Sequence, residues 1–282
     1  MKDIRWRIVL LLLVCAVAAA GLAVRQERQR QLEAVLSQRE ERHIKVIAHR
    51  GGAACAPENT LAALEQAITV GADLAEIDLR MTRDGVVVAL HDEDLSRTAG
   101  LKQKVCDMDS QAVRTLDAGH WFSSEYAGEQ IPTLTEVLNT TRGRLPLILE
   151  LKHTYSDQLL LERVVEEICV AGMEGECILA SSSLELLRQG KVLAPEVKNI
   201  YIGEKADAQL WALSYVDGYS ICLTELTAQD VQQAHQTGRE LYVWTVNEPW
   251  ELARGVLLGA DGLVTDNPVL ARDVLQGSTF AG

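Results

Sequence analysis

The segment from Ala48 to Thr98 is rich in histidines and carboxylates. Histidine is the side chain whose ordinary pKa lies nearest neutral pH, so His49 and His91 can take up and release protons there. Glu76 and Asp78 are two residues apart, so in a strand both carboxylates leave the same face and can bind one cation. These residue types and this spacing predict metal-assisted acid–base chemistry.

A β-hairpin is expected between Asp78 and His91, because Asp84-Gly85 is a strong two-residue turn signal. With these two residues as the loop, counting outward pairs Asp78 with His91. A parallel pair is excluded because it needs a crossover of about a dozen residues or more. We therefore expect the hairpin to return His91 to the strand that carries the carboxylates.

Strand-like and helix-like segments alternate after residue 43. The predicted strands are Val46–Ala48, Leu74–Leu79, Pro146–Leu151, Cys177–Ser181, Asn199–Ile202, Val216–Ile221, Glu240–Thr245 and Gly262–Thr265. The predicted helices include Thr60–Val70, Asp157–Ala171, Ser183–Leu193, Thr227–Thr237 and Pro249–Leu258, and glycines suited to helix C-termini are Gly71, Gly172, Gly238 and Gly259. This alternation predicts an α/β protein with the (β/α)8 TIM-barrel fold. Residues 94–132 form an insertion after the second barrel strand.

Polar side chains end several of the predicted strands, and in such barrels the chemistry occurs at the C-terminal strand ends. They are His49 and Arg50 on the first strand, Glu76 and Asp78 on the second, Glu150 and Lys152 on the third, and Trp244 on the seventh. We expect these side chains to meet at one rim. An anionic substrate would find positive charge there in Arg50, Lys152 or a bound cation.

The composition permits a large core and limits the choice of partners. The chain has 282 residues, of which 48% are hydrophobic, and a formal net charge of -13. This acidity argues against nucleic acid or an anionic membrane surface as the main partner of the domain, since both require basic patches.

The N-terminus carries an uncharged apolar run, Ile8–Val24. As a helix it would be about 26 Å long, near the lower limit for crossing a bilayer. Basic residues within 2–7 favour a cytoplasmic N-terminus and an extracytoplasmic domain. Ala18–Ala20 also resembles a signal-peptidase site, so residues 1–24 are either a transmembrane anchor or a cleaved signal that yields a secreted form. Residues 25–43 are read as a charged helical stalk, followed by the catalytic domain at 44–276.

The cysteines give no support for a zinc site or a redox motif, because no two have Cys-x-x-Cys spacing. A Cys55–Cys106 disulfide would be possible outside the cytoplasm. We nevertheless expect the five cysteines of the domain to be free thiols.

The ordered set of motifs from Lys45 onward resembles the glycerophosphodiester phosphodiesterase family. The motifs are His49-Arg50-Gly51, Pro57-Glu58-Asn59-Thr60, Gly71-Ala72-Asp73, Glu76-Ile77-Asp78, Thr82-Arg83-Asp84-Gly85, His91-Asp92, Leu95-Ser96-Arg97-Thr98, Ile131-Pro132-Thr133-Leu134, Glu150-Leu151-Lys152 and Val243-Trp244-Thr245-Val246-Asn247. The departures are small: Ala99 replaces a frequent Thr, and Ser182 a frequent Phe.

The resemblance implies hydrolysis of a glycerophosphodiester to sn-glycerol 3-phosphate and an alcohol, with Mg2+ or Ca2+ in the site. By motif, the metal ligands would be Glu76, Asp78 and Glu150, the acid–base pair His49 and His91, the phosphate contacts Arg50 and Lys152, and a wall of the substrate pocket Trp244. Two alternatives are a lysophospholipase D-type activity and a catalytically inactive, membrane-tethered binding protein. The inactive protein should lack one or more of these polar residues, and none is missing.

Overall fold

A computed structural model describes residues 21, 43–153, 156–206 and 208–276. Residues 43–272 form one compact unit. The predicted membrane segment 1–24 and stalk 25–43 lie outside the described residues, except for Gly21 and His43. Among the residues that are described, no helix is long and apolar enough to cross a membrane.

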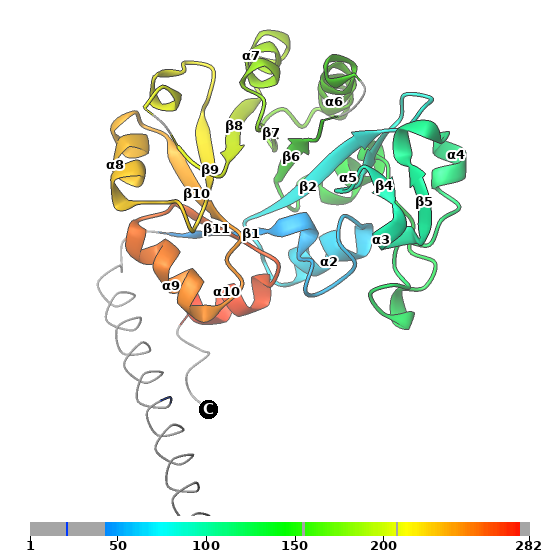
Figure 1. Ribbon diagram of the computed structural model, residues 1–282, viewed down its shortest axis with the longest axis horizontal. Helices are drawn as coiled ribbons and strands as arrows, with labels where there is room; N and C mark the ends of the chain where they lie inside the picture. The colour runs from blue at the N-terminus through cyan, green and yellow to red at the C-terminus, as the bar shows by residue number, and fades with distance from the viewer. Residues whose placement is uncertain (1–20, 22–42, 154–155, 207, 277–282) are drawn as a thin grey trace, which may run out of the picture. The chain divides into compact units, whose positions relative to one another are not determined.

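Eight parallel strands close into a barrel, which confirms the predicted fold (Figure 1). They are β1 (Lys45–Ala48), β2 (Leu74–Met81), β6 (Leu147–Leu151), β7 (Cys177–Ser181), β8 (Lys198–Gly203), β9 (Gly218–Cys222), β10 (Glu240–Trp244) and β11 (Gly262–Thr265). β1 pairs with both β11 and β2, which completes the ring. The predicted strands match these bounds to within two residues at each end.

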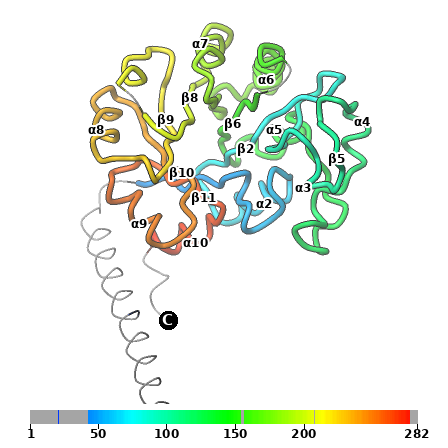
Figure 2. Tube along the Cα trace, viewed as in Figure 1, coloured from blue at the N-terminus to red at the C-terminus, as the bar shows by residue number. Residues whose placement is uncertain are grey.

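Helices surround the barrel on its outer side (Figures 1 and 2). They are α2 (Leu61–Thr69), α5 (Leu134–Thr141), α6 (Asp157–Ala171), α7 (Leu184–Leu193), α8 (Ala228–Gln236), α9 (Pro249–Leu258) and α10 (Pro268–Leu275). The four glycines expected after helices all have positive φ, between 65° and 95°. Helix α5 was not among the predicted helices, although a capping box of Thr133 and Glu136 begins it.

Alternate residues of the strands face two separate cores. Ile47, Ile148, Ile200, Tyr242 and Val264 point into the barrel and form one buried cluster. The intervening residues pack against the helices in a second cluster. Because side chains alternate along a strand, the inward row that carries this apolar layer continues into the polar residues at the rim.

The chain between β2 and α5 forms a small folded excursion. Its elements are β3 (Val87–Ala89), β4 (Asp94–Leu95), α3 (Ser96–Ala99), β5 (Leu101–Lys104), the 3-10 turns η2 (Val105–Asp107) and η3 (Ser124–Tyr126), and α4 (Ser110–Val113). A core of its own stabilises it, made of Val88, Leu90, Leu95, Val105, Met108, Val113, Ala118 and Ile131. The excursion is therefore a packed structure beside the barrel rim.

The predicted hairpin forms, but its predicted register is wrong by one residue. Thr82 N donates to Val86 O at 3.0 Å, so the loop contains three residues, of which the last is Gly85. Gly85 has φ +81°, the left-handed conformation that ends a three-residue hairpin loop. As a result Leu90, and not His91, pairs with Asp78, through a Leu90 N to Asp78 O bond of 3.0 Å. His91 is the residue immediately beyond this pair.

Candidate active site

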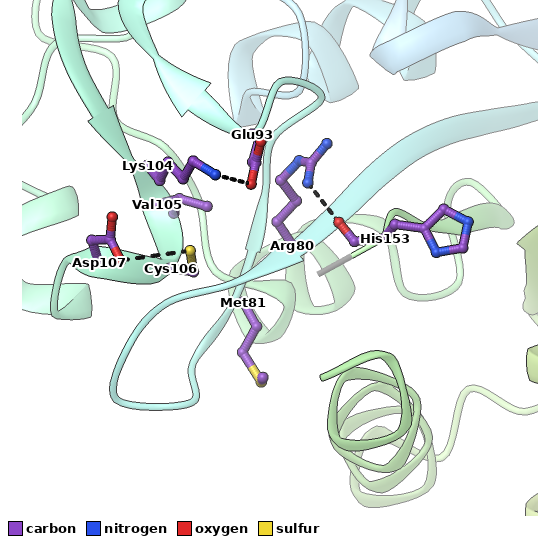
Figure 3. Close-up of a pocket in the computed structure, with 8 residues that line it drawn as sticks. All are labelled: Arg80, Met81, Glu93, Lys104, Val105, Cys106, Asp107 and His153. Atoms are coloured by element: carbon purple, nitrogen blue, oxygen red, sulfur yellow. Dashed lines mark hydrogen bonds and ion pairs between the residues drawn. The ribbon is translucent and has the colours of Figure 1, made fainter. Parts of the chain in front are cut away.

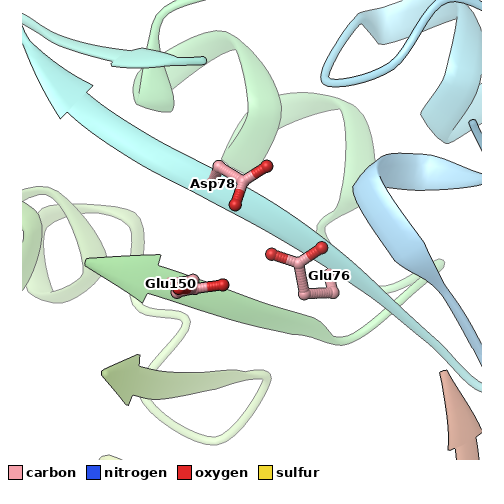
Figure 4. A group of neighbouring side chains, drawn as sticks. All are labelled: Glu76, Asp78 and Glu150. Atoms are coloured by element: carbon pink, nitrogen blue, oxygen red, sulfur yellow. The ribbon is translucent and has the colours of Figure 1, made fainter. Parts of the chain in front are cut away.

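Three carboxylates meet where β2 and β6 lie side by side, with Glu150 near the C-terminal end of β6 and with Glu76 and Asp78 in the middle of β2 (Figure 4). Asp78 and Glu150 are register partners on these neighbouring strands, and Glu76 precedes Asp78 by one full strand repeat. One oxygen from each of the three lies within 4.8 Å of the others. The predicted convergence of Glu76, Asp78 and Glu150 on one point is therefore present in the fold.

The electrostatics of this cluster are unfavourable without additional positive charge. Burial, and then the negative charge of Asp78, raise the pKa of Glu76 to about 8. Burial also opposes ionisation of Asp78, but Lys152 and Arg50 outweigh it and lower the Asp78 pKa. Lys152 Nζ lies 2.9 Å from Asp78 Oδ1 and 2.7 Å from Glu150 Oε1.

The donor set fits a hard divalent cation. Glu76 Oε1 is buried and has no hydrogen-bond partner among the described residues. A buried carboxylate oxygen without a partner is costly, and a cation bound by three carboxylates would remove that cost. All three ligands are oxygens, as Mg2+ and Ca2+ prefer, and no cysteine or histidine belongs to the cluster.

His49 follows β1, and its side chain is held by Asp266, which follows the neighbouring strand β11. Its Nδ1 lies 2.6 Å from Asp266 Oδ1, and Asp266 Oδ2 accepts a hydrogen bond from Asn247 Nδ2 at 2.6 Å. Burial opposes ionisation of Asp266, but the bond and charge of His49, the bond from Asn247 and the charge of Arg50 together outweigh it and lower the Asp266 pKa. An ionised carboxylate only accepts, so Nδ1 carries a proton. His49 Nε2 then lies 3.9 Å from Glu76 Oε2.

The pKa of His49 reflects these neighbours. Burial lowers it, but the hydrogen bond to Asp266 and the charge of Glu76 outweigh burial, and the net result is a raised pKa. The imidazole is thus suited to hold a proton next to the carboxylate cluster.

His91 is oriented in a similar way by its sequence neighbour. His91 Nδ1 lies 2.8 Å from Asp92 Oδ1, and Arg97 Nε donates to Asp92 Oδ2 at 2.7 Å. Burial opposes ionisation of Asp92, but the bonds from Arg97 and His91 lower its pKa to about 2. Asp92 is therefore ionised, and the neutral imidazole keeps its lone pair on Nε2.

Arg50 is held against the carboxylates by a tight turn that continues through Gly51. Arg50 has φ +52° and its amide donates to Glu76 Oε2 at 2.9 Å, while its guanidinium contacts Glu58 and Asp78. The chain then turns through Gly51, where a Cβ would lie 2.8 Å from the Cβ of Ala63 in α2. The close approach to the helix requires glycine and fixes Arg50 against the carboxylates.

Trp244 ends β10, at the rim as predicted. Its Nε1 donates to Ser220 O at 3.1 Å, and its ring packs against the buried cluster inside the barrel. The indole therefore forms the top of the apolar layer beneath the rim.

Four further residues belong to the site, and the sequence alone assigned them no role. Thr60 caps α2, and the preceding Asn59 bonds both the carboxylate and the amide of Asp78. Asp266 follows a predicted strand, so the strand-end rule could have found it. Glu58 and Arg97 lie in motifs whose partners are far apart in the sequence, and only the fold shows that they meet.

A cavity of about 640 Å3 lies beside the rim, between β2, the excursion and the residues after β6 (Figure 3). Its lining comprises Arg80, Met81, Glu93, Lys104, Val105, Cys106, Asp107 and His153. Arg80, which follows Asp78 on the same face of β2, lines this cavity and donates to the backbone oxygens of His91 and His153 at 2.9 Å each. The walls carry charges of both signs.

The expectation of free thiols holds for the described cysteines. Cys55, Cys106, Cys169, Cys177 and Cys222 are all free.

Residues 49–270 match the model of the Glycerophosphoryl diester phosphodiesterase family. A glycerophosphodiester phosphodiesterase from Caldanaerobacter subterraneus is 32% identical over 231 residues, covering 79% of this chain and 94% of the relative. One from Bacillus altitudinis is 31% identical over 233 residues, covering 79% and 95%.

Solved structures agree with the sequence matches. An Oleispira antarctica phosphodiesterase in complex with the product sn-glycerol-3-phosphate has a TM-score of 0.78 at 28% identity, covering 82% of this chain and 96% of that one. A glycerophosphodiester phosphodiesterase from Agrobacterium tumefaciens has a TM-score of 0.71 at 28% identity, covering 81% and 99%.

Proposed function

Because this chain belongs to the glycerophosphoryl diester phosphodiesterase family, we propose that it hydrolyses glycerophosphodiesters to sn-glycerol 3-phosphate and an alcohol with the aid of a divalent cation. The observation that carries the proposal is the meeting of three carboxylates with two oriented histidines at one barrel rim. The product bound to the Oleispira antarctica phosphodiesterase supports sn-glycerol 3-phosphate as the common product.

Glu76, Asp78 and Glu150 would hold the cation, either Mg2+ or Ca2+. When bound, the cation would offset the negative charge that grows on the phosphoryl oxygens in the transition state. Arg50 and Lys152 add fixed positive charge beside these carboxylates, where a substrate phosphate can be bound.

His49 and His91 would perform the proton transfers. Each has its Nδ1 held by an aspartate, so each presents Nε2 for proton exchange. One histidine takes a proton from the nucleophile, and the other gives a proton to the leaving alcohol. The same pair can serve an attacking water or the substrate's own glycerol hydroxyl.

The leaving alcohol must be selected by the walls around this site. Trp244 would supply an apolar wall, and the charged cavity that Arg80 lines suits a small polar alcohol better than an acyl chain. We therefore infer that small glycerophosphodiesters are preferred over lysophospholipids.

The test is a substrate panel with the purified full chain. We expect turnover of glycerophosphocholine and glycerophosphoethanolamine in Mg2+ or Ca2+, release of sn-glycerol 3-phosphate, and loss of turnover in excess chelator. The kcat/KM for lysophosphatidylcholine should be lower. Full activity in chelator would contradict the cation, and a clear preference for the lysolipid would make the protein a lysophospholipase D-type enzyme.

We also propose that residues 1–24 attach the domain to the membrane with the domain outside the cytoplasm. The support is the uncharged run Ile8–Val24 and the basic residues that precede it.

A further inference from the structure

Arg97 in α3 reaches two different parts of the site with one side chain. Its Nε donates to Asp92 Oδ2 at 2.7 Å, and its Nη1 and Nη2 donate to the two oxygens of Glu58 at 2.6 and 2.8 Å. One planar guanidinium thus binds two carboxylates in a fixed mutual geometry. A lysine ammonium, which is a single point of charge, cannot do so.

Each of the two carboxylates holds a site residue with its other contacts. Asp92 Oδ1 lies 2.8 Å from His91 Nδ1, and Glu58 Oε1 accepts from Arg50 Nη1 at 2.9 Å. His91 follows β3 and Arg50 follows β1, so the two belong to separate elements. Arg97 therefore links the carboxylate behind the histidine to the carboxylate behind the arginine.

The surroundings hold Arg97 in place. The Glu58 side chain is only 7% exposed, so its charge depends on its arginine partners. The Arg97 guanidinium also lies over the ring of Trp121, 5.9 Å from its centroid, and Trp121 Nε1 donates to Ala118 O at 2.8 Å. Trp121, another residue of the folded excursion, thus adds a cation–π contact that holds the guanidinium.

We propose that Arg97 is a positioning residue that sets the orientation of His91 relative to Arg50 through Asp92 and Glu58. The proposal rests on the proposed function, because it gives His91 the proton transfer and Arg50 the phosphate. It also gives the excursion after β2 a part in catalysis, since the excursion carries the side chain that aligns two groups of the barrel rim.

Steady-state kinetics of the full chain with glycerophosphocholine test separately the contact through Asp92 to His91 and the contact through Glu58 to Arg50. Arg97→Ala should lower kcat by about 10- to 100-fold, as removal of outer supporting groups does elsewhere, and should raise KM as well. Asp92→Asn should lower mainly kcat, and Glu58→Gln should raise mainly KM. In the double variant Arg97→Ala, Asp92→Asn, kcat should fall by less than the product of the single effects, because both changes act on His91.

Arg83 offers a matched control. It lies within the same excursion and binds both oxygens of Asp109, at 2.9 and 2.6 Å. Its other hydrogen bond is to the backbone oxygen of Asp107 at 3.3 Å, so among the described residues none of its bonds reaches a histidine or a carboxylate of the site. Arg83→Ala should leave kcat and KM within about twofold of wild type, because an exposed pair contributes little. Arg97→Lys should not restore activity, and it carries the same expectations if Arg97→Ala does not fold.

A second readout is independent of turnover. In nitrogen NMR spectra, His91 of the wild type should be protonated on Nδ1 in its neutral form, and Arg97→Ala should give a mixture of tautomers. Unchanged kcat, KM and tautomer in Arg97→Ala, or full rescue by Arg97→Lys, would overturn the proposal. If the wild type hydrolyses no glycerophosphodiester, the proposed function fails, while the NMR result still decides whether Arg97 orients His91.

Discussion

At the residue scale, the first prediction concerns the carboxylates of Glu76, Asp78 and Glu150, which repel one another because they lie close together. A cation bound between them would relieve this repulsion, so its binding can be tested by protein stability without substrate. A cation at 100 times its Kd should stabilise the full chain by about 2.7 kcal/mol, which is about 5–10 °C in Tm for a domain of this size. Glu76→Gln and Glu150→Gln should abolish the shift. The exposed Glu185→Gln is the control and should retain it. A shift that survives in both site variants would place the cation elsewhere.

Asp266 permits a test of the His49 tautomer. Its two oxygens accept from His49 Nδ1 and Asn247 Nδ2. Asn247 Oδ1 accepts from the backbone amide of Asp266 at 2.8 Å, so Asn247 Nδ2 stays a donor toward this side chain. In Asp266→Asn the amide oxygen must therefore face Asn247, the new NH2 group faces His49, and the imidazole is driven toward protonation on Nε2. We expect kcat to fall by at least about tenfold with little change in KM. Asp157→Asn, beside the exposed His153, should leave kcat unchanged. Equal losses in the two variants would contradict the assignment.

The sequence predicted the positions of individual site residues correctly where a polar residue stands at the end of a predicted strand. His49, Glu76, Asp78, Glu150 and Lys152 were placed at the rim by that rule, and they meet there. Their catalytic and ligand roles remain predictions. Asp266 satisfies the same rule but lies in a run whose other residues suggested no chemistry. The contact of Arg97 with Glu58 joins residues 39 apart in the sequence through two loops, and no local pattern encodes it.

The hairpin after β2 shows, at the scale of elements, what local signals can and cannot determine. Asp84-Gly85 correctly marked the turn, because Gly85 adopts positive φ. The length of the loop depends on contacts with residues other than Asp84 and Gly85. Asp84 accepts from Thr82 Oγ1 at 2.6 Å and from the amide of Ser110 at 2.9 Å, and this draws Arg83 into the loop. A register that depends on such contacts shifts by one residue without any change in the turn signal.

Asp84 also predicts a dependence of stability on pH. The bonds from Thr82 and Ser110 lower its pKa to about 2, from an ordinary value of about 4. A lowered pKa means that the native state binds fewer protons, so this contribution is complete above about pH 4 and is lost as the pH falls toward about 2. Wild type should be more stable than Asp84→Asn by about 1 kcal/mol or less, since the group is exposed. Urea midpoints at pH 7, 5 and 3 measure the difference, and a constant difference would contradict it.

At the scale of the whole molecule, the barrel was predictable because its strands are short, largely apolar runs that alternate with helices. Four of the eight, β2, β7, β10 and β11, also follow a glycine of positive φ that comes after a helix. The two buried clusters inside and outside the strands require this alternation. The excursion was predicted as a segment, but apart from the hairpin strand β3 its elements were not. Its strands β4 and β5 are two and four residues long, and so short a pair leaves no periodic pattern to recognise. Its fold depends on a separate core that only tertiary packing creates.

The last prediction concerns how the whole chain sits in the cell. The run Ile8–Val24 is uncharged, and Lys2, Arg5 and Arg7 precede it. Positive residues remain on the cytoplasmic side during insertion, so the domain should lie on the opposite side. Protease added to intact cells with a permeabilised outer envelope should therefore digest the domain, while a cytoplasmic marker protein survives.

N-terminal sequencing of the mature protein distinguishes the two forms of this topology. An uncleaved anchor retains Met1 or its neighbours and stays in the membrane fraction. Cleavage after Ala18–Ala20 would release the domain in soluble form and would place the mature N-terminus near Gly21. Protection of the domain until the inner membrane is lysed would reverse the proposed orientation. A domain in this reversed orientation would hydrolyse its substrate in the cytoplasm. The basic residues that follow the apolar run, Arg25, Arg28 and Arg30, would then have determined the orientation of insertion.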